Sequence, residues 1–207
     1  FEDYPFLFSR VLILLPEVEF PNEFDAINDP FNGSVEFIQN SKLRKIIKKY
    51  PDHNIFRSWQ LFNEDFEPVG YVPLIIDIDN SDLDISKAYK LTAKCLRYFE
   101  EASLFQKQNS LRIVFSGKKG FHIEARGEQK FDGDQIRSDL VSYLNINRKS
   151  VSCSNVFDEG IIDVFHEITR VTGSNNIWTD GKKYLKRQVA EISVDDFRKF
   201  SFSDLVN

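Results

Sequence analysis

The chain has 207 residues, of which 42% are hydrophobic and 14% aromatic, and it carries a formal net charge of −5 at pH 7. This length and apolar content can bury a substantial core, in one domain or in two closely packed lobes. The acidic balance excludes a protein that simply coats nucleic acid, because neutralising phosphates requires lysine and arginine in excess. No stretch approaches the roughly 18 uninterrupted apolar residues of a membrane span. Residues 11–15 are too short for a signal sequence and have no basic lead-in. We therefore expect a cytoplasmic protein that does not contact membranes.

The counts of cysteine, histidine and methionine bear on disulfides, on zinc sites and on whether the chain is part of a longer protein. The two cysteines, Cys95 and Cys153, are too few for a disulfide framework, and the chain has three histidines and no CxxC pair. We therefore expect no zinc, and two small buried thiols. The chain has no methionine, not even an initiator, which indicates a domain excised from a longer protein.

The first half of the chain predicts one basic helix and a hairpin. Residues 1–40 lack clear periodicity and predict irregular structure or short strands. Residues 41–50 place Leu, Ile and Tyr at helical spacing with lysines and an arginine on the opposite face, and Pro51 ends this helix. Its basic face is either solvated or in contact with a nucleic-acid backbone, and the sequence leaves both open. Two β-rich runs, 55–62 and 69–78, then predict a hairpin around an acidic turn.

The second half mixes helices and strands. Apolar residues recur along one face of 84–105, which predicts the strongest helix of the chain. The other predicted elements are two strands around a loop at 111–126, a helix at 132–144, strands at 161–165 and 184–192, and a helix at 194–200. Because there is no strict βαβ alternation, the predicted fold class is α+β, built on a largely antiparallel sheet.

The stretch PLIIDIDNSD, residues 73–82, predicts an acidic pair at the end of a strand. Side chains two apart on a strand share a face, so Asp77 and Asp79 project together about 6.7 Å apart along the backbone. Two neighbouring carboxylates repel unless a cation compensates, and divalent metals prefer such hard oxygen ligands. The alternative is that one or both acids cap the following helix.

The stretch SGKKGFH, residues 116–122, predicts an anion-binding loop. Its glycines let the backbone approach an anion, its lysines add charge, and Ser116 and His122 can donate hydrogen bonds to phosphate oxygens. It is not a P-loop, because GxxxxGK[ST] is absent. The alternative is a solvated hairpin loop with a packed histidine.

A third polar segment lies between residues 161 and 176. Asp163 sits in a short apolar strand, where burial is unfavourable without a partner. Arg170 begins the sequence RVTGSNN, in which a cation and a turn of small hydrogen-bonding residues predict a second polar pocket. Together the three segments supply three acids for metal and two cationic loops for phosphate.

These motifs, in this order, resemble those of the archaeo-eukaryotic primase superfamily, which includes replicative primase small subunits and primase-polymerases. Its strand ending in DxD matches 75–79, and its motif SG[KR][KR]GxH matches 116–122 without a gap. Its third aspartate matches Asp163, and its segment RxPG[ST]xN resembles 170–176, with Thr172 in place of proline. The resemblance covers roughly residues 70–190.

The resemblance implies a nucleotidyltransferase that synthesises or extends primers from dNTPs or NTPs on a DNA template. Asp77, Asp79 and Asp163 would be catalytic and would hold two Mg²⁺ or Mn²⁺ ions. The implied nucleotide-binding residues are Ser116, Gly117, Lys118, Lys119, Gly120, His122, Arg170, Ser174 and Asn176.

The implied fold is a primase catalytic core, a mixed and largely antiparallel sheet with an RRM-like unit flanked by helices. Residues 1–207 would form one catalytic domain, with an N-terminal lobe at 1–70 and the motifs at 71–193. The implied partners are DNA template and primer, and helicase, primase accessory or CRISPR-associated domains of a longer protein. Two other functions stay open: a catalytically inactive nucleic-acid-binding replication or defence module, and a metal-dependent phosphohydrolase or nuclease.

Overall fold

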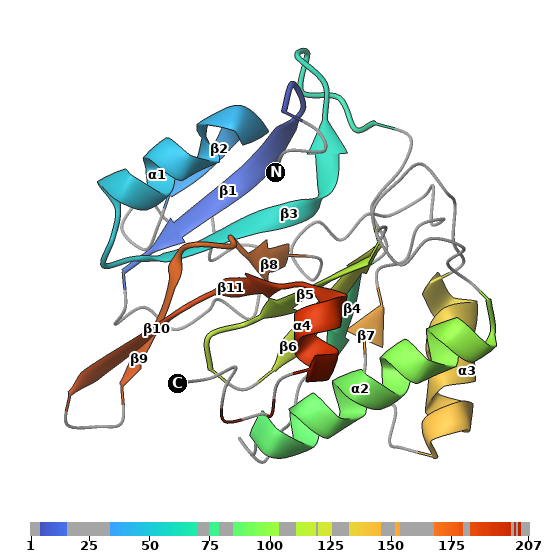
Figure 1. Cartoon of the computed structure of the whole chain (residues 1–207). Helices are drawn as coiled ribbons and strands as arrows, with labels where there is room; N and C mark the ends of the chain where they lie inside the picture. Colours follow the sequence, from blue (N-terminus) through green and yellow to red (C-terminus); the bar gives the residue numbers. More distant parts are fainter. Residues whose placement is uncertain are drawn as a thin grey trace. The chain divides into compact units, whose positions relative to one another are not determined.

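The computed structural model describes residues 5–15, 34–69, 75–78, 85–103, 111–118, 120–125, 133–145, 152–153, 168–179, 183–199, 201 and 203. The chain divides into two compact units, each built from two segments of the sequence (Figure 1). Unit 1 comprises Phe1–Val72 and Ile161–Val189, and unit 2 comprises Pro73–Gly160 and Ala190–Asn207. Each unit contains its own sheet, so the coarse prediction of a mixed α+β fold is confirmed, with two sheets instead of one.

Unit 1 is a sheet whose strands run in the order β10-β9-β3-β1-β2, with β8 also paired to β3. The pairings are antiparallel, apart from a parallel contact between β3 and β9 at Asn54 and Asn175. The strands are β1 (Phe8–Leu14), β2 (Ser34–Gln39), β3 (Asn54–Phe62), β8 (Ile168–Arg170), β9 (Asn175–Thr179) and β10 (Tyr184–Gln188).

One helix covers a face of this sheet. A 3-10 turn (Asn40–Lys42) leads into α1 (Leu43–Lys49), and the backbone N–H of Tyr50 closes its last turn on Ile46. The apolar face of α1 packs on buried residues of the strands, so the predicted basic helix is confirmed. These residues are Val11, Ile13, Ile38 and Ile55 of the strands, together with Val171, which directly follows β8.

Residues 1–40 are expected to form irregular structure or short strands, but residues 8–14 form the seven-residue strand β1. Residues 11–14 are all buried, and β1 lies between β2 and β3. A strand buried on both faces is a continuous apolar run without alternation, so it gives no periodic signal.

Unit 2 is a sheet in the order β11-β5-β6-β4-β7, and every pairing in it is antiparallel. One face of it packs against the helices around a core that includes Ile78, Ile113, Phe121 and Ile123 (Figure 1). The strands are β4 (Ile75–Ile78), β5 (Leu111–Phe115), β6 (Phe121–Ala125), β7 (Ser152–Cys153) and β11 (Ala190–Ile192). The helices are α2 (Ile85–Glu101), α3 (Gly133–Leu144) and α4 (Val194–Lys199).

These three helices and the hairpin of β5 and β6 confirm the predictions for this part of the chain. Helix α2 ends earlier than predicted, and Ser103 beyond it has a positive φ of 51°. Cys95 is buried as expected, whereas the side chain of Cys153 and the strand predicted at 161–165 lie outside the described residues. None of the described helices combines the length and the apolar composition needed to span a bilayer.

The predicted hairpin of 55–62 and 69–78 is wrong. Strand β3 belongs to the sheet of unit 1 and β4 to that of unit 2. Within the described residues, the chain after β3 turns back at Val69, whose N–H donates to the carbonyl of Leu61 (2.9 Å). Strand β3 has β1 on one side and β8 and β9 on the other, so it has no free edge for β4.

The single strand predicted at 184–192 is also wrong, because this segment forms β10 and β11 in different sheets. The residue between them, Val189, is buried and bonded to a turn of unit 1. Its carbonyl accepts from Gly173 N–H (2.7 Å), and its N–H donates to Ser174 O (2.8 Å). Pairing with β9 therefore stops at Gln188.

Candidate active site

The first predicted acid and the predicted histidine lie side by side in unit 2. The register of β4 and β6 places Asp77 directly opposite His122, and His122 Nε2 lies 3.3 Å from Asp77 Oδ1. The histidine side chain is 9% exposed and the aspartate side chain 35% exposed. A ligand in solvent can therefore reach the carboxylate, while the imidazole is held in place behind it.

Strand alternation explains why these two side chains share a face. Ile76 and Ile78, on either side of Asp77, lie in the core beneath the helices, and so does Ile123 next to His122. Successive strand residues point to opposite faces, so Asp77 and His122 both lie on the face away from that core.

The loop between β5 and β6 is closed by two hydrogen bonds. Ser116 N–H donates to the carbonyl of Gly120 (3.0 Å), and Gly120 N–H donates to Ser116 Oγ (3.1 Å). Gly117 has a φ of +84°, a left-handed conformation in which a side chain is disfavoured. The backbone of this turn is thus fixed by the Ser and Gly residues of the motif, and the partly buried Lys118 lies at its tip. His122 follows two residues after the loop on the same hairpin.

The other two acids remain predictions. Asp79, Asp163 and the loop residue Lys119 lie outside the described residues. Within the described part of the chain, no group of three or more His, Cys, Asp and Glu side chains could hold a metal ion. Asp77 itself fits such a role, because it offers a partly exposed carboxylate oxygen at the predicted place.

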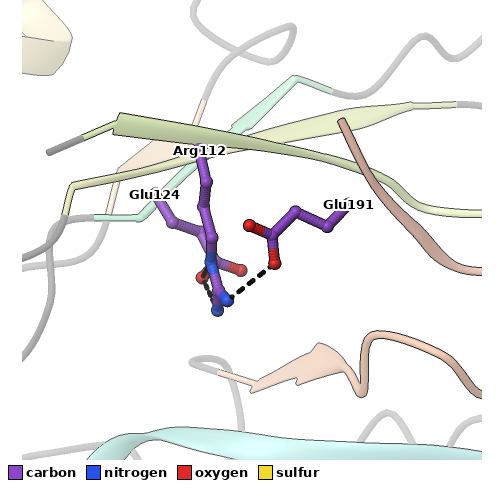
Figure 2. Close-up of polar contacts among 3 residues, drawn as sticks. All are labelled: Arg112, Glu124 and Glu191. Carbon is purple, nitrogen blue, oxygen red and sulfur yellow. Dashed lines mark hydrogen bonds and ion pairs between the residues drawn. The ribbon is translucent and has the colours of Figure 1, made fainter. Parts of the chain in front are cut away.

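A buried charge cluster occupies the same face of the sheet as Asp77 and His122 (Figure 2). Arg112 on β5 lies opposite Glu124 on β6, and its Nε donates to Glu124 Oε2 (2.6 Å), with Nη2 bonded to the same oxygen. Arg112 Nη1 also donates to Glu191 Oε2 of β11 (3.3 Å). The side chains of Arg112 and Glu124 are only 7% and 5% exposed. Each neutralises the charge of the other, which burial would otherwise make costly.

Sequence reasoning missed this cluster. Glu124 stands two residues after His122 and so shares its face by strand alternation, and the register of the hairpin places Arg112 across from it.

The predicted cation Arg170 lies in unit 1. Its Nη1 donates to Asn54 Oδ1 (2.8 Å), and its guanidinium lies over the ring of Phe56, 4.4 Å from the centroid. Burial lowers the pKa of Arg170 to about 10, so it stays charged at neutral pH but is poorly solvated. Among the described residues it forms no ion pair with a carboxylate. A desolvated cation of this kind favours an anionic ligand.

Asn54, which the sequence did not single out, organises this part of unit 1. Its Oδ1 also accepts from Ile177 N–H (2.9 Å), and its Nδ2 donates to Ile177 O (3.0 Å). The amide side chain thus joins β3 to β9 and holds Arg170 at the same time. Nothing in the local sequence signals this role, because the partners of Asn54 are more than 100 residues away.

Ser174 and Asn176 are both buried in unit 1. The Ser174 hydroxyl donates to the carbonyl of Val171 (2.6 Å), so it closes the turn that follows Arg170. Gly173 in this turn has a φ of +89°. The predicted contact of Ser174 and Asn176 with a nucleotide stays a prediction, as does the meeting of this segment with the loop of unit 2.

Comparison with known proteins supports the resemblance noted in the sequence. No model of a known protein family matches the chain. The DNA primase small subunit PriS of Pyrobaculum aerophilum is 32% identical to it over 153 residues, covering 59% of this chain and 48% of that protein. The DNA primase small subunit PriS of Pyrobaculum calidifontis is 28% identical over 123 residues, covering 49% of this chain and 38% of that protein. The chain therefore spans about half the length, or less, of these curated relatives. Both matches show that the chain is similar to DNA primase small subunits over about half of its length, which supports the resemblance to the archaeo-eukaryotic primase superfamily.

Proposed function

We propose that the chain contains the catalytic core of a primase-polymerase, which joins nucleotides to a primer under the direction of a DNA template. One observation supports this most: Asp77 and His122 lie side by side at the end of a hairpin whose loop is closed by Ser116 and Gly120. A carboxylate for metal and a structured cationic loop for phosphate are the two parts that nucleotidyl transfer needs.

The proposal includes two divalent ions, Mg²⁺ or Mn²⁺, held by Asp77, Asp79 and Asp163. When bound, such ions activate a 3′-hydroxyl and neutralise the charge of the triphosphate. Asp77 fits this role in its chemistry and exposure, and the other two acids are assigned by the sequence motif.

The residues of the loop would bind the nucleotide's phosphates. Lys118 and Lys119 would supply positive charge in a turn that the hydrogen bonds between Ser116 and Gly120 close. His122 would donate a hydrogen bond to a phosphate oxygen, and Asp77 would keep its ring oriented.

Residues of unit 1 are also assigned to this site. Arg170 would contribute a second cation, with Ser174 and Asn176 nearby in the sequence. Its low solvation suits it to a phosphate, because ion pairing restores the interactions that burial removes.

The finer assignments belong to the same proposal. The sheet and helices of unit 2 would correspond to the RRM-like unit of the superfamily. The substrates would be dNTPs or NTPs with a DNA template and primer in the cytoplasm, and helicase or accessory domains would be supplied by a longer protein or by partners.

Primer extension tests this function. The purified chain is incubated with a primed DNA template, dNTPs or NTPs and Mn²⁺, beside the variant Asp77→Asn, which removes the charge and keeps the shape. Template-dependent extension by the wild type that disappears in the variant supports the proposal. Nucleic-acid binding without extension would indicate an inactive binding module, and strand cleavage would indicate a nuclease; either result refutes the proposal.

A further inference from the structure

Helix α1 of unit 1 carries a basic face that the proposed catalytic site does not use. Its apolar residues pack on the sheet, while every cation of the segment is exposed. The exposed cations are Lys42, Arg44, Lys45, Lys48 and Lys49. The segment 40–51 contains no acidic residue.

Part of this charge is unfavourable to the helix itself, although Lys48 and Lys49 in its last turn suit the helix dipole. Lys42 is the N-cap residue, it makes no capping hydrogen bond through its side chain, and the first turn contains no acid. Cations at this end of a helix oppose its dipole. Lys45 and Lys49 are four residues apart, as are Arg44 and Lys48, and like charges at this spacing repel. A polyanion bound along this face would relieve both effects.

Three lysines of this face have no acidic partner among the described residues. None of Lys42, Lys45 and Lys48 forms an ion pair with a described Asp or Glu side chain. The pKa of Lys49 is raised, first by a hydrogen bond with Tyr50 and to a smaller extent by the charge of Glu36 on β2.

Strand β10 of the same unit brings Lys186 beside the end of α1, where it shares its charge with one exposed acid, Asp52. Lys186 Nζ lies 3.2 Å from Asp52 Oδ1, and Asp52 follows α1 by three residues. Tyr184, two residues before Lys186 and therefore on the same face of this strand, is 58% exposed. An exposed aromatic ring beside cations suits a strand whose bases stack while its phosphates pair with lysine.

We infer that the exposed lysines of α1, together with Lys186 and Tyr184 on β10, bind the phosphate backbone of a single-stranded nucleic acid. This inference deepens the proposed function, since it assigns the template strand to a surface of unit 1. Charge complementarity favours a nucleic acid, because this surface gathers several exposed cations while the chain as a whole carries a net charge of −5.

The test compares two triple variants with the same change in net charge. Lys45→Gln/Lys48→Gln/Lys49→Gln removes three charges from α1. The control, Lys87→Gln/Lys90→Gln/Lys94→Gln, removes three exposed charges from α2 in unit 2. Binding of a labelled single-stranded oligonucleotide is measured by fluorescence anisotropy at several salt concentrations, without metal or nucleotide, and circular dichroism checks the folding of each variant.

The α1 variant is expected to lower the slope of log affinity against log salt by about 2 units and to raise Kd roughly 100-fold at 0.1 M salt. The α2 control is expected to stay within about twofold of the wild type, and replacing the same three α1 lysines by arginine is expected to restore the slope. Equal losses in both glutamine variants, no loss in the α1 variant, or a wild type that binds without salt dependence would each overturn the inference. Because the assay contains no nucleotide, its result is independent of primer extension, so failure of the surface and failure of the proposed function are distinguishable.

Discussion

Breaking the buried pair of Arg112 and Glu124 should destabilise unit 2. The variant Glu124→Gln removes the negative charge with little change in shape and leaves a guanidinium whose side chain is 7% exposed. Breaking a buried pair costs about 3–5 kcal/mol. Arg112 keeps its contact with Glu191, which is 42% exposed, so we expect the lower end, about 3 kcal/mol. For a chain of this length that corresponds to a fall in Tm of about 6–12 °C.

The matched control is Asp52→Asn, which makes the same chemical change in the exposed pair of Asp52 and Lys186. Those side chains are 74% and 57% exposed, so the expected loss is under about 1 kcal/mol. Unfolding is followed by far-ultraviolet circular dichroism, because both tryptophans, at 59 and 178, belong to unit 1 and their fluorescence does not report on unit 2. If Glu124→Gln unfolds within about 1 kcal/mol of the wild type, the reasoning about this cluster is refuted.

Three further substitutions test the site in different ways. His122→Ala is expected to raise KM for nucleotide or to lower kcat with template affinity unchanged, as measured by steady-state extension and anisotropy; an equal loss of template binding would contradict its assignment to the triphosphate. Gly117→Ala is expected to cost about 1–2 kcal/mol in thermal denaturation, because φ is +84° there, and to weaken nucleotide binding; unchanged stability and binding would show that the loop adapts. Asn54→Ala is expected to lower the free energy of unfolding in urea by about 1–3 kcal/mol, because the backbone of Ile177 and the guanidinium of Arg170 lose their partner; a loss below about 0.5 kcal/mol would mean that water replaces it.

The elements that the sequence predicts well are those whose evidence is local. Helix α2 repeats its apolar residues every three to four positions, and β5 and β6 flank a loop rich in glycine and lysine. The errors concern which strand pairs with which. The runs 55–62 and 69–78 follow one another as a hairpin would, but the edges of β3 are occupied by β1, β8 and β9, strands from other parts of the chain.

The candidate site divides in the same way. The two strands around residues 116–120 are a local signal, and the hairpin of β5 and β6 matches that prediction, while anion binding by the loop stays a prediction. The contact of Asp77 with His122 depends on the register between β4 and β6, which motif order suggests but does not determine. Arg170 donates to Asn54, which lies 116 residues earlier in the chain, and no local sequence pattern predicts such a contact.

In the proposed function, Asp77 and the loop before His122 together form one site for a metal-bound nucleotide. Isothermal titration of dGTP into the chain with Mn²⁺, with Mg²⁺ and without divalent ions tests it most directly, with Asp77→Asn as the matched variant. We expect the wild type to bind dGTP at least about 10-fold more tightly with a divalent ion, and Asp77→Asn to lose most of this difference. Equal, metal-independent binding by both proteins, or no uptake of dGTP by the wild type, would contradict it.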